Sequence, residues 1–365
     1  MRTGFTTGAC AAAAAKAAAR CLVQGLTLTA IETTLPNRLR VTFALARCEL
    51  APPRVTCGVI KDAGDDPDCT HGAELIATVE LRAEPGVEIR GGAGVAVVTK
   101  PGLGLEVGAP AVNPVPRRNI TEMVEEELSQ GPSRGAIVLL SVPGGEEMAK
   151  QTLNARLGLL GGISILGTSG IVRPYSTASF KASILQAIDV AQQRGHHTLV
   201  VTTGGKSEAY AMKLHAEVPE DAFIQMGDFV GITLRHCARR GIGRALIVGM
   251  IGKLSKMAGG KMQTHAAGSE VSLDLLADLA AGIGADPALV AAIRAANTAR
   301  HVLELTAARG LTRLPAEICR HVVAHGTRHA GGALRVEAEL VDFDGRLLGR
   351  FPPLDTTPPA AGGTP

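Results

Sequence analysis

Two short segments, TLVVTTGGK at residues 198–206 and RALIVGMIGK at residues 244–253, share one pattern. Each is a run of aliphatic and β-branched residues that ends in glycines and a lysine, which is typical of a buried strand. Apolar residues at helical spacing precede both runs, at 180–191 and again after Asp228, which is expected to cap the second helix. This repeat of helix, strand and glycine loop predicts parallel strands joined by crossover helices.

The residues that follow predict further helices and a final hairpin. Alternation across 334–350, with Asp344-Gly345 between the two halves, is typical of a β-hairpin. Helical patterns are expected before it at 271–283, 287–296, 298–309 and 315–324. We therefore expect an α/β domain at 176–350, followed by a Pro-, Gly- and Thr-rich disordered tail at 351–365.

The first half of the chain has a different character. Thr7 or Gly8 is expected to cap an alanine-rich helix over 9–19, and residues 39–46 and 75–81 alternate like half-buried strands. A turn at 84–86 predicts a hairpin into a strand at 87–90. Further elements are expected at 95–99 (strand), 119–130 (helix) and 136–142 (strand). The predicted fold is α/β overall: an α+β N-terminal domain at 1–175 with a mixed or antiparallel sheet, and a smaller C-terminal α/β domain with a parallel sheet.

Composition narrows the class of protein. The 37 basic and 34 acidic residues nearly balance, and no basic block is long enough to follow a nucleic acid, so nucleic-acid binding is not expected. No apolar run approaches the roughly 18 residues that span a bilayer, so no membrane segment is expected. Seven scattered cysteines without a C-x-x-C pair indicate a reducing cytoplasm. The sequence does not determine the oligomeric state, and a homo-oligomer is compatible with it.

The two glycine loops are the first candidate site. In open parallel sheets, ligands bind beyond the carboxyl ends of the strands, where small residues let a ligand approach the backbone. Gly205-Lys206-Ser207 does not complete a P-loop, because position 200 is Val where that motif needs Gly. The alternative is that these glycines only permit tight turns.

Three other groups of residues carry charge or metal-ligand chemistry. Four aspartates crowd residues 62–68, a loop that either binds a ligand or is solvated, without the spacing of a calcium loop. His321, His325 and His329 share the spacing of one helix face, but helix termination near Gly326 favours a role at the helix C-terminus over a metal site. Basic residues at 117–118 and 253–265 suit an anionic ligand, or are ordinary surface charges.

Longer strings resemble one family. They are RTGFTTGACAAAAAKAAA (2–19), TCGVIKDAGDDPDCTHGAE (56–74), GGAGVAVVTKPGLGLEVGAPAVNPVPRR (91–118), SVPGGEEMAKQTLNARLGLLGGISILGTSGIVRP (141–174) and MGDFVGITLRHCARRGIGRALIVGMIGKLSKMAGGKMQTH (226–265). In order and content these strings are similar to the cobalt-precorrin-5B C1-methyltransferase family, CbiD, of anaerobic cobalamin biosynthesis. Phe5 and Ala9 stand where the family is expected to have Tyr and Thr, and Cys69 where an aliphatic residue is usual.

The resemblance implies an S-adenosylmethionine-dependent methyl transfer to C-1 of a corrin macrocycle, giving cobalt-precorrin-6A. It implies a tetrapyrrole substrate that carries its own cobalt, and no metal ion held by the protein. The sulfonium methyl is already activated, so the protein mainly aligns the reactants and excludes water. A small-molecule kinase and a non-catalytic corrinoid-binding protein are the alternatives.

On this basis we assign candidate residues to each ligand. Residues expected to hold the methyl donor are Asp62, Asp65, Asp66, Gly204, Gly205, Gly249 and Gly252. Residues expected to hold substrate carboxylates are Arg117, Arg118, Lys253, Lys256, Lys261 and His265, with Thr6 and Thr7 at the N-terminus of the first helix. No residue is assigned to catalysis.

Overall fold

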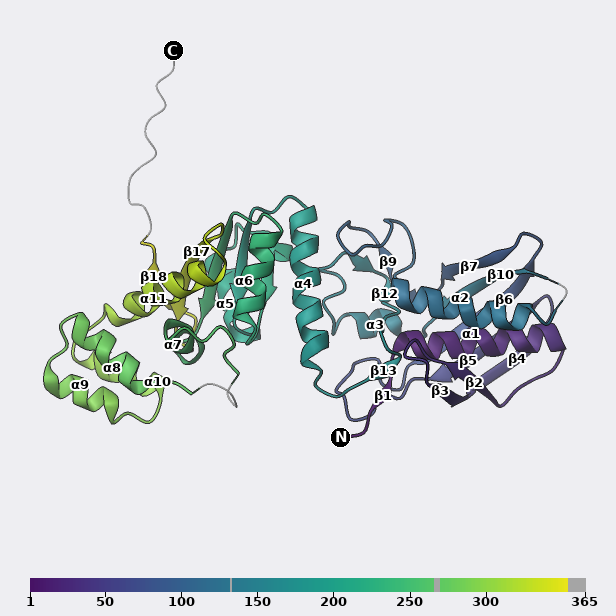
Figure 1. Ribbon diagram of the computed structural model, residues 1–365, viewed down its shortest axis with the longest axis horizontal. Coiled ribbons are helices and arrows are strands. Elements are labelled where there is room, and N and C mark those ends of the chain that lie inside the picture. Colours follow the sequence, from purple (N-terminus) through teal and green to yellow (C-terminus); the bar gives the residue numbers. More distant parts are fainter. Residues whose placement is uncertain (132, 266–269, 354–365) are drawn as a thin grey trace, which may run out of the picture. The chain divides into compact units, whose positions relative to one another are not determined.

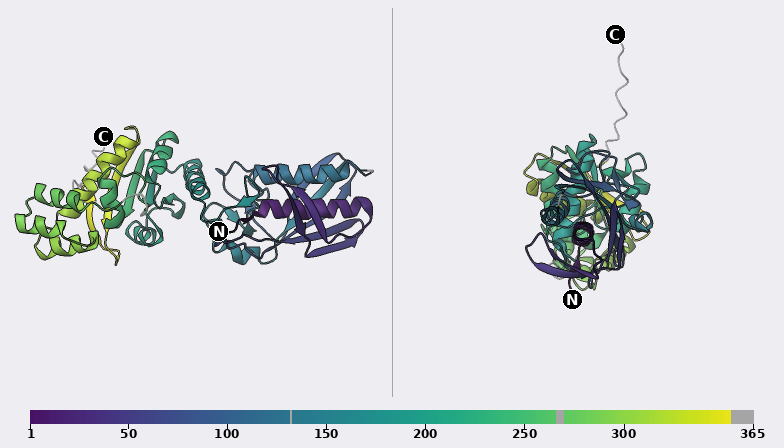
Figure 2. Two further views of the ribbon diagram at one scale, coloured as in Figure 1. Left: turned by 60° about the horizontal axis from the view of Figure 1, so that its bottom comes forward. Right: turned by 90° about the vertical axis from the view of Figure 1, so that its right-hand side faces the viewer.

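Contacts within the chain divide the structure, a computed structural model, into two units, Met1–Ser179 and Phe180–Pro365 (Figures 1 and 2). The structure describes residues 1–131, 133–265 and 270–353. Each unit has its own sheet and core, and the two are of similar length. Within these residues no helix has both the length and the apolar character needed to cross a bilayer.

Helix α1 (Thr7–Gln24) forms the centre of the first unit. Its cap is Thr6, whose Oγ1 accepts a hydrogen bond from the Ala9 N–H at 3.2 Å, so the expected cap at Thr7 or Gly8 is wrong by one or two residues. The helix ends at Gly25, which adopts the left-handed conformation that favours glycine. Its alanines are buried almost completely. Such small side chains let α1 pack closely on helix α2 (Pro114–Leu128) and on the sheet (Figures 1 and 2).

The sheet of the first unit has five strands in the order β4-β5-β6-β10-β7. They are β4 (Arg47–Ala51), β5 (Arg54–Ile60), β6 (Glu74–Arg82), β10 (Gly135–Ser141) and β7 (Gly86–Gly91). Strand β10 pairs antiparallel with β6 and parallel with β7, so the hairpin predicted at 84–86 is wrong. The apolar sequence of β10 suits the interior of a sheet, whereas the more polar β7 suits an edge.

Short elements complete the first unit. They are β1 (Gly4–Phe5), β2 (Ala30–Thr34), β3 (Arg40–Ala44), β8 (Gly94–Val95), β9 (Val97–Val98), α3 (Gly145–Ala149), β11 (Leu159–Leu160), β12 (Gly162–Ile163) and β13 (Ile171–Val172). The single strand expected at 95–99 is therefore divided between β8 and β9. Helix α2 begins at Pro114 rather than at 119, because proline is tolerated in the first turn of a helix.

The second unit has a sheet in the order β15-β14-β16-β17-β18. The strands are β15 (Phe223–Gln225), β14 (Thr198–Thr202), β16 (Arg244–Gly249), β17 (Arg335–Val341) and β18 (Leu347–Phe351). The first four are parallel, and β18 returns antiparallel to β17, which confirms both the parallel sheet and the final hairpin. The predicted tail at 351–365 begins inside β18, and residues 354–365 lie outside the described residues.

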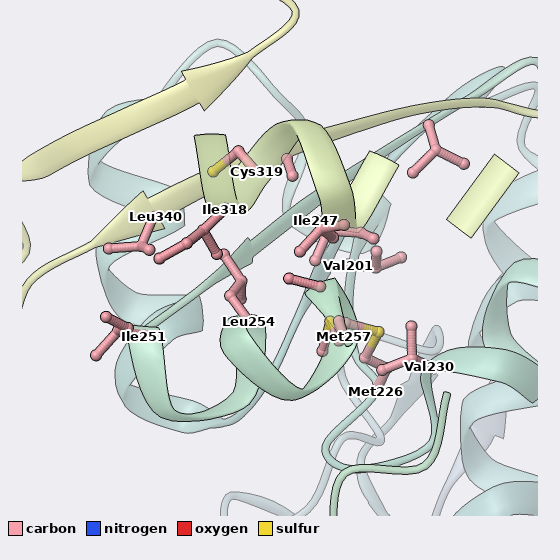
Figure 3. Close-up of a cluster of buried hydrophobic side chains, with 14 of the residues drawn as sticks. Val201, Met226, Val230, Ile247, Ile251, Leu254, Met257, Ile318, Cys319 and Leu340 are labelled. Carbon is pink, nitrogen blue, oxygen red and sulfur yellow. The ribbon is translucent and has the colours of Figure 1, made fainter. Parts of the chain in front are cut away.

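Helices cover both faces of this sheet. On one face, α5 (Gly205–Leu214) packs on Val200, Leu246 and Val248. The opposite face carries the larger core, where Ile251, Leu254 and Met257 of α7 (Ile251–Ala258) meet residues of helix α11 (Leu314–His329) and β17 (Figure 3). The remaining helices are α4 (Thr177–Gln193), α6 (Val230–Arg239), α8 (Leu273–Gly282), α9 (Pro287–Arg294) and α10 (Ala299–Ala308), with the one-turn η1 at Glu220–Ala222. The α/β class expected from the sequence is confirmed.

The sequence predicted that the last long helix ends near Gly326. This prediction is wrong, because helix α11 continues to His329. A Cβ at Gly326 would lie 3.1 Å from Val336 and 3.3 Å from Leu234. This glycine therefore permits close packing inside the helix and does not terminate it.

Candidate functional site

The order of strands creates a topological switch point in the second unit. From β14 the chain passes through α5 to β15 on one side, while β16 lies on the other side of β14. Adjacent loops that leave the sheet in opposite directions open a crevice at the carboxyl ends of the strands. The loops at this point are the two glycine loops of the sequence, which begin at Thr203 and Met250.

A cavity of about 680 Å³ lies at this crevice, a volume typical of small-molecule sites. Six of the predicted site residues line it: Gly204, Gly205, Gly252, Lys253, Lys256 and His265. The other lining residues are Thr203, Lys206, Ser207, Asp228, Met250, Thr264, Val271 and Phe343. The structure thus brings glycines assigned to the donor and cations assigned to the substrate into one cavity.

Lys253 and Asp228 form the polar centre of this cavity. The Lys253 Nζ lies 3.0 Å from Asp228 Oδ1 and donates to the Thr203 carbonyl at 2.6 Å. Thr264 donates its hydroxyl to the same Asp228 oxygen at 3.0 Å, and its carbonyl accepts from Lys256 Nζ at 3.1 Å. Partial burial opposes ionisation of Asp228, but the hydrogen bond and charge of Lys253 outweigh it and lower the pKa of that carboxyl. The Asp228 carboxyl is therefore ionised at neutral pH.

Asp228 does not cap helix α6, contrary to the sequence prediction. The cap position is Phe229, and the α6 N-terminus has no side-chain cap. The carboxylate instead holds Lys253 and Thr264 at the cavity. It is a site residue that the sequence prediction assigned to a structural role.

The cavity as a whole favours anions. Lys206, Lys253 and Lys256 line it, and Asp228 is the single carboxylate among the described lining residues. The N-termini of α5 and α7 begin at its edge, and the free N–H groups of helix N-termini favour negative charge. A ligand with one or more carboxylates fits this arrangement.

The glycines of the site fall into two kinds. At Gly204 and Gly252, an added Cβ would meet no atom within 4 Å, and the Gly204 backbone is extended, so the fold does not require glycine at either position. At Gly249, a Cβ would lie 2.3 Å from Leu254 and 2.8 Å from Thr203, so its role is packing, and it does not line the cavity. The structure therefore has open space beside the backbone at 204 and 252.

Phe343 is one of the lining residues that the sequence prediction missed. It lies between β17 and β18 and also borders two neighbouring cavities of about 570 and 420 Å³. Phe343 is 38% exposed, and the Arg300 guanidinium lies 5.0 Å from the centroid of its ring. With only 9 aromatic residues in the chain, an aromatic residue beside the predicted turn was the available signal.

The predicted aspartates lie in the other unit, in contact with protein groups. Asp62 pairs with Arg2, which lowers the pKa of Asp62 to about 2, and Asp65 accepts from the Arg2 backbone N–H. Asp66 accepts from the Tyr175 backbone N–H at 2.8 Å. These contacts fix the N-terminal segment and the loop, which is a structural use of the carboxylates.

Thr6 and Thr7, at the N-terminus of α1, are also in contact with protein groups. The Thr6 hydroxyl caps the helix, and the Thr7 hydroxyl accepts from the Leu166 N–H at 2.9 Å. The Gly8 N–H donates to the Leu166 carbonyl. Thr6 and Thr7 were expected to bind a carboxylate with the free N–H groups of this helix N-terminus, but the N–H groups of Thr6, Gly8 and Ala9 already donate within the chain.

The remaining predicted cations are spread over both units. Arg117 and Arg118 lie in the first turns of α2 rather than in a loop, and neither has an acidic partner in the described part of the chain. Lys261 follows α7 with an exposed side chain and does not line the cavity. Gly205 lines it with a Cβ position 3.3 Å from Gln225.

The three histidines of α11 do not converge on one point. His321 contacts Glu317, whereas His329 contacts Arg235. Across residues 1–131, 133–265 and 270–353, one group of potential metal ligands lies close together: Cys21, Cys48 and Cys57. The Ser207 hydroxyl donates to the Gly204 carbonyl at 2.8 Å and lies 3.2 Å from the Thr203 hydroxyl.

Comparison with known proteins gives relatives over nearly the full chain. The family model CbiD matches residues 1–174, and that of the CbiD C-terminal domain matches residues 263–352. Proteins named cobalt-precorrin-5B C(1)-methyltransferase from Leptospira interrogans and Geobacillus sp. are 54% and 50% identical over 96% of this chain, and the match covers 95% and 96% of their own lengths. A crystal structure of a cobalamin biosynthesis protein (cbiD) from Archaeoglobus fulgidus is 30% identical, with a TM-score of 0.39 over 71% of this chain and 80% of that one. On the strength of the sequence matches, this chain belongs to the CbiD family.

Proposed function

We propose that the chain is a cobalt-precorrin-5B C(1)-methyltransferase, which adds a methyl group to C-1 of its macrocycle and gives cobalt-precorrin-6A. The observation that supports this most is the 54% identity to relatives of that name over nearly the whole of both chains. Neither the kinase nor the non-catalytic corrinoid-binding alternative receives similar support. We place the enzyme in the cytoplasm, since all seven cysteines are free thiols.

S-adenosylmethionine is the donor that we propose, and the cavity at the switch point suits it. Gly204 and Gly252 leave room for a ligand beside the backbone, and Asp228 offers a carboxylate to ribose hydroxyls or to an ammonium group. Lys206 and the N-termini of α5 and α7 suit the carboxylate of the amino-acid part. The donor supplies a methyl group already activated by its positive sulfur.

The residues of the chain then have three tasks. Lys253 and Lys256 hold acidic groups of the macrocycle by charge, and Asp228 keeps Lys253 oriented at 3.0 Å. The glycine loops determine how closely a reactant can pack against the backbone. Fixing two reactants in line and excluding water accounts for most of the rate in such a transfer, so the lack of an assigned acid–base pair is no obstacle.

The test is a transfer assay under anaerobic conditions. Purified enzyme is given cobalt-precorrin-5B and S-adenosylmethionine with a deuterated methyl group, and the pigment is analysed by mass spectrometry. One labelled methyl group in the macrocycle is the expected result. An unaltered pigment would refute the proposal, and thermal stabilisation by ATP with none by S-adenosylhomocysteine would favour the kinase.

A further inference from the structure

Three cysteines from three elements meet in the first unit, whereas all residues of the cavity described above belong to the second unit. Cys21 lies near the end of α1, and Cys48 of β4 and Cys57 of β5 face each other as cross-strand partners. The three sulfur atoms all lie within 4.8 Å of one another, and Cys21 Sγ and Cys48 Sγ are 3.5 Å apart. We propose that Cys21, Cys48 and Cys57 form a binding site for a soft divalent metal ion such as Zn²⁺.

The spacing of the sulfur atoms fits such an ion with little movement. A Zn–S bond of about 2.3 Å in tetrahedral geometry places the sulfur atoms of two ligands roughly 3.7 Å apart. The observed separations, 3.5 Å for one pair and at most 4.8 Å for any pair, bracket this value. A disulfide needs about 2.0 Å between sulfur atoms, so the thiols are not already bonded in pairs.

A backbone donor provides a second, independent indication. The Leu28 N–H points at Cys48 Sγ, with 3.3 Å between nitrogen and sulfur. A neutral thiol is a weak acceptor, whereas hydrogen bonds to sulfur are a regular feature of thiolate–metal centres. The loop after α1 thus presents a donor that gains most when Cys48 is a thiolate.

Burial determines how the ion would enter and what it displaces. Cys21 and Cys57 are fully buried, whereas Cys48 is half-buried and gives the cluster its access to solvent. Burial raises the pKa of Cys21 to about 11 and also raises that of Cys57. Each metal–sulfur bond formed by a protonated cysteine replaces its S–H bond, and that proton leaves to solvent. A water molecule at the Cys48 side would complete four-coordination.

Titration of the full-length, reduced protein with Cd²⁺ under anaerobic conditions tests the site, because cadmium–thiolate bonds absorb in the ultraviolet. We expect one equivalent to bind, to be displaced by Zn²⁺ and to protect Cys48 from alkylation by iodoacetamide. Cys48→Ser should weaken binding by at least the roughly 10–100-fold seen when an outer partner of a metal site is removed. Cys69→Ser removes a half-buried thiol of the same unit outside the cluster and is the matched control.

Each outcome of this titration decides the proposal. No stoichiometric absorption in the wild type, or equal affinity in Cys48→Ser and Cys69→Ser, would overturn it. Alkylation protection in the wild type gives a readout that does not depend on whether a variant folds. Alkylation of Cys48 at the same rate with and without Cd²⁺ would therefore also overturn it.

Discussion

Replacing Gly252 by alanine should stabilise the protein and weaken its ligand. Gly252 is the second residue of α7, and its added Cβ meets no atom within 4 Å. Alanine in place of glycine inside a helix stabilises by about 0.5–1 kcal/mol. That gain raises the melting temperature by roughly 1–4 °C in a unit of this size.

The same methyl group projects into the space where we place the donor. A ligand packed on the Gly252 backbone must move, and a loss of about 1.4 kcal/mol corresponds to a tenfold rise in Kd. Calorimetric titration with S-adenosylhomocysteine measures this change, and a thermal melt of the same sample measures the stability. We expect a higher melting temperature together with weaker binding of S-adenosylhomocysteine.

Gly249→Ala is the matched control, three residues earlier in the chain. Its Cβ would meet Leu254 at 2.3 Å and Thr203 at 2.8 Å, an overpacking that destabilises by about 1–3 kcal/mol. We expect a lower melting temperature there. If Gly252→Ala binds S-adenosylhomocysteine as tightly as the wild type, the donor does not contact this loop and our placement is wrong.

Three further predictions concern charge, capping and pH. Lys253→Met should raise the Kd for an acidic ligand about ten- to hundredfold, measured by calorimetry, because a charge-assisted hydrogen bond is lost beside Asp228; an unchanged Kd would remove Lys253 from the site. Thr6→Ala should lower the free energy of unfolding by about 1 kcal/mol in urea denaturation, through loss of the α1 cap; equal stability would show that the cap is dispensable. A hydrogen bond to Glu339 raises the pKa of His215. The contact therefore stabilises the protein fully below the pKa of the unfolded state, near 6.5, and its contribution is lost as pH rises through the higher pKa of the folded state. His215→Gln should flatten this part of the plot of unfolding free energy against pH, and a plot parallel to that of the wild type would contradict the assignment.

The parallel sheet of the second unit could be predicted from the sequence because its pattern is local. Residues 198–202 and 244–249 are apolar on both faces and end in glycines, which identifies buried strands and their loops from neighbouring residues alone. The order of those strands then determines where a ligand binds, so the position of the cavity followed from the same pattern. Six of its fourteen described lining residues were predicted, three of them glycines of the two loops and three of them basic residues that follow the second strand.

Strands and side chains that pair over long distances in sequence could not be predicted. Nothing near residues 84–86 shows that β10 inserts between β6 and β7, because the partner strand lies some fifty residues later in sequence. Asp228 precedes a helix, as capping residues do, and only the fold brings Lys253 to its carboxylate. Phe343 reaches the cavity from a connection that follows the last parallel strand. The pairings of β10 and of Asp228 depend on the tertiary structure and have no signal in the neighbouring sequence, whereas for Phe343 the signal was an aromatic residue beside the predicted turn.

The position of β10 also constrains how the protein is made. On a ribosome, β6 and β7 emerge first, and both of their inner edges stay unpaired until Gly135–Ser141 has been synthesised. Unpaired edges of this kind invite pairing with other nascent chains. A fragment that stops before residue 135 should therefore aggregate, whereas one that continues past 141 can close the sheet, so synthesis itself sets the order of assembly.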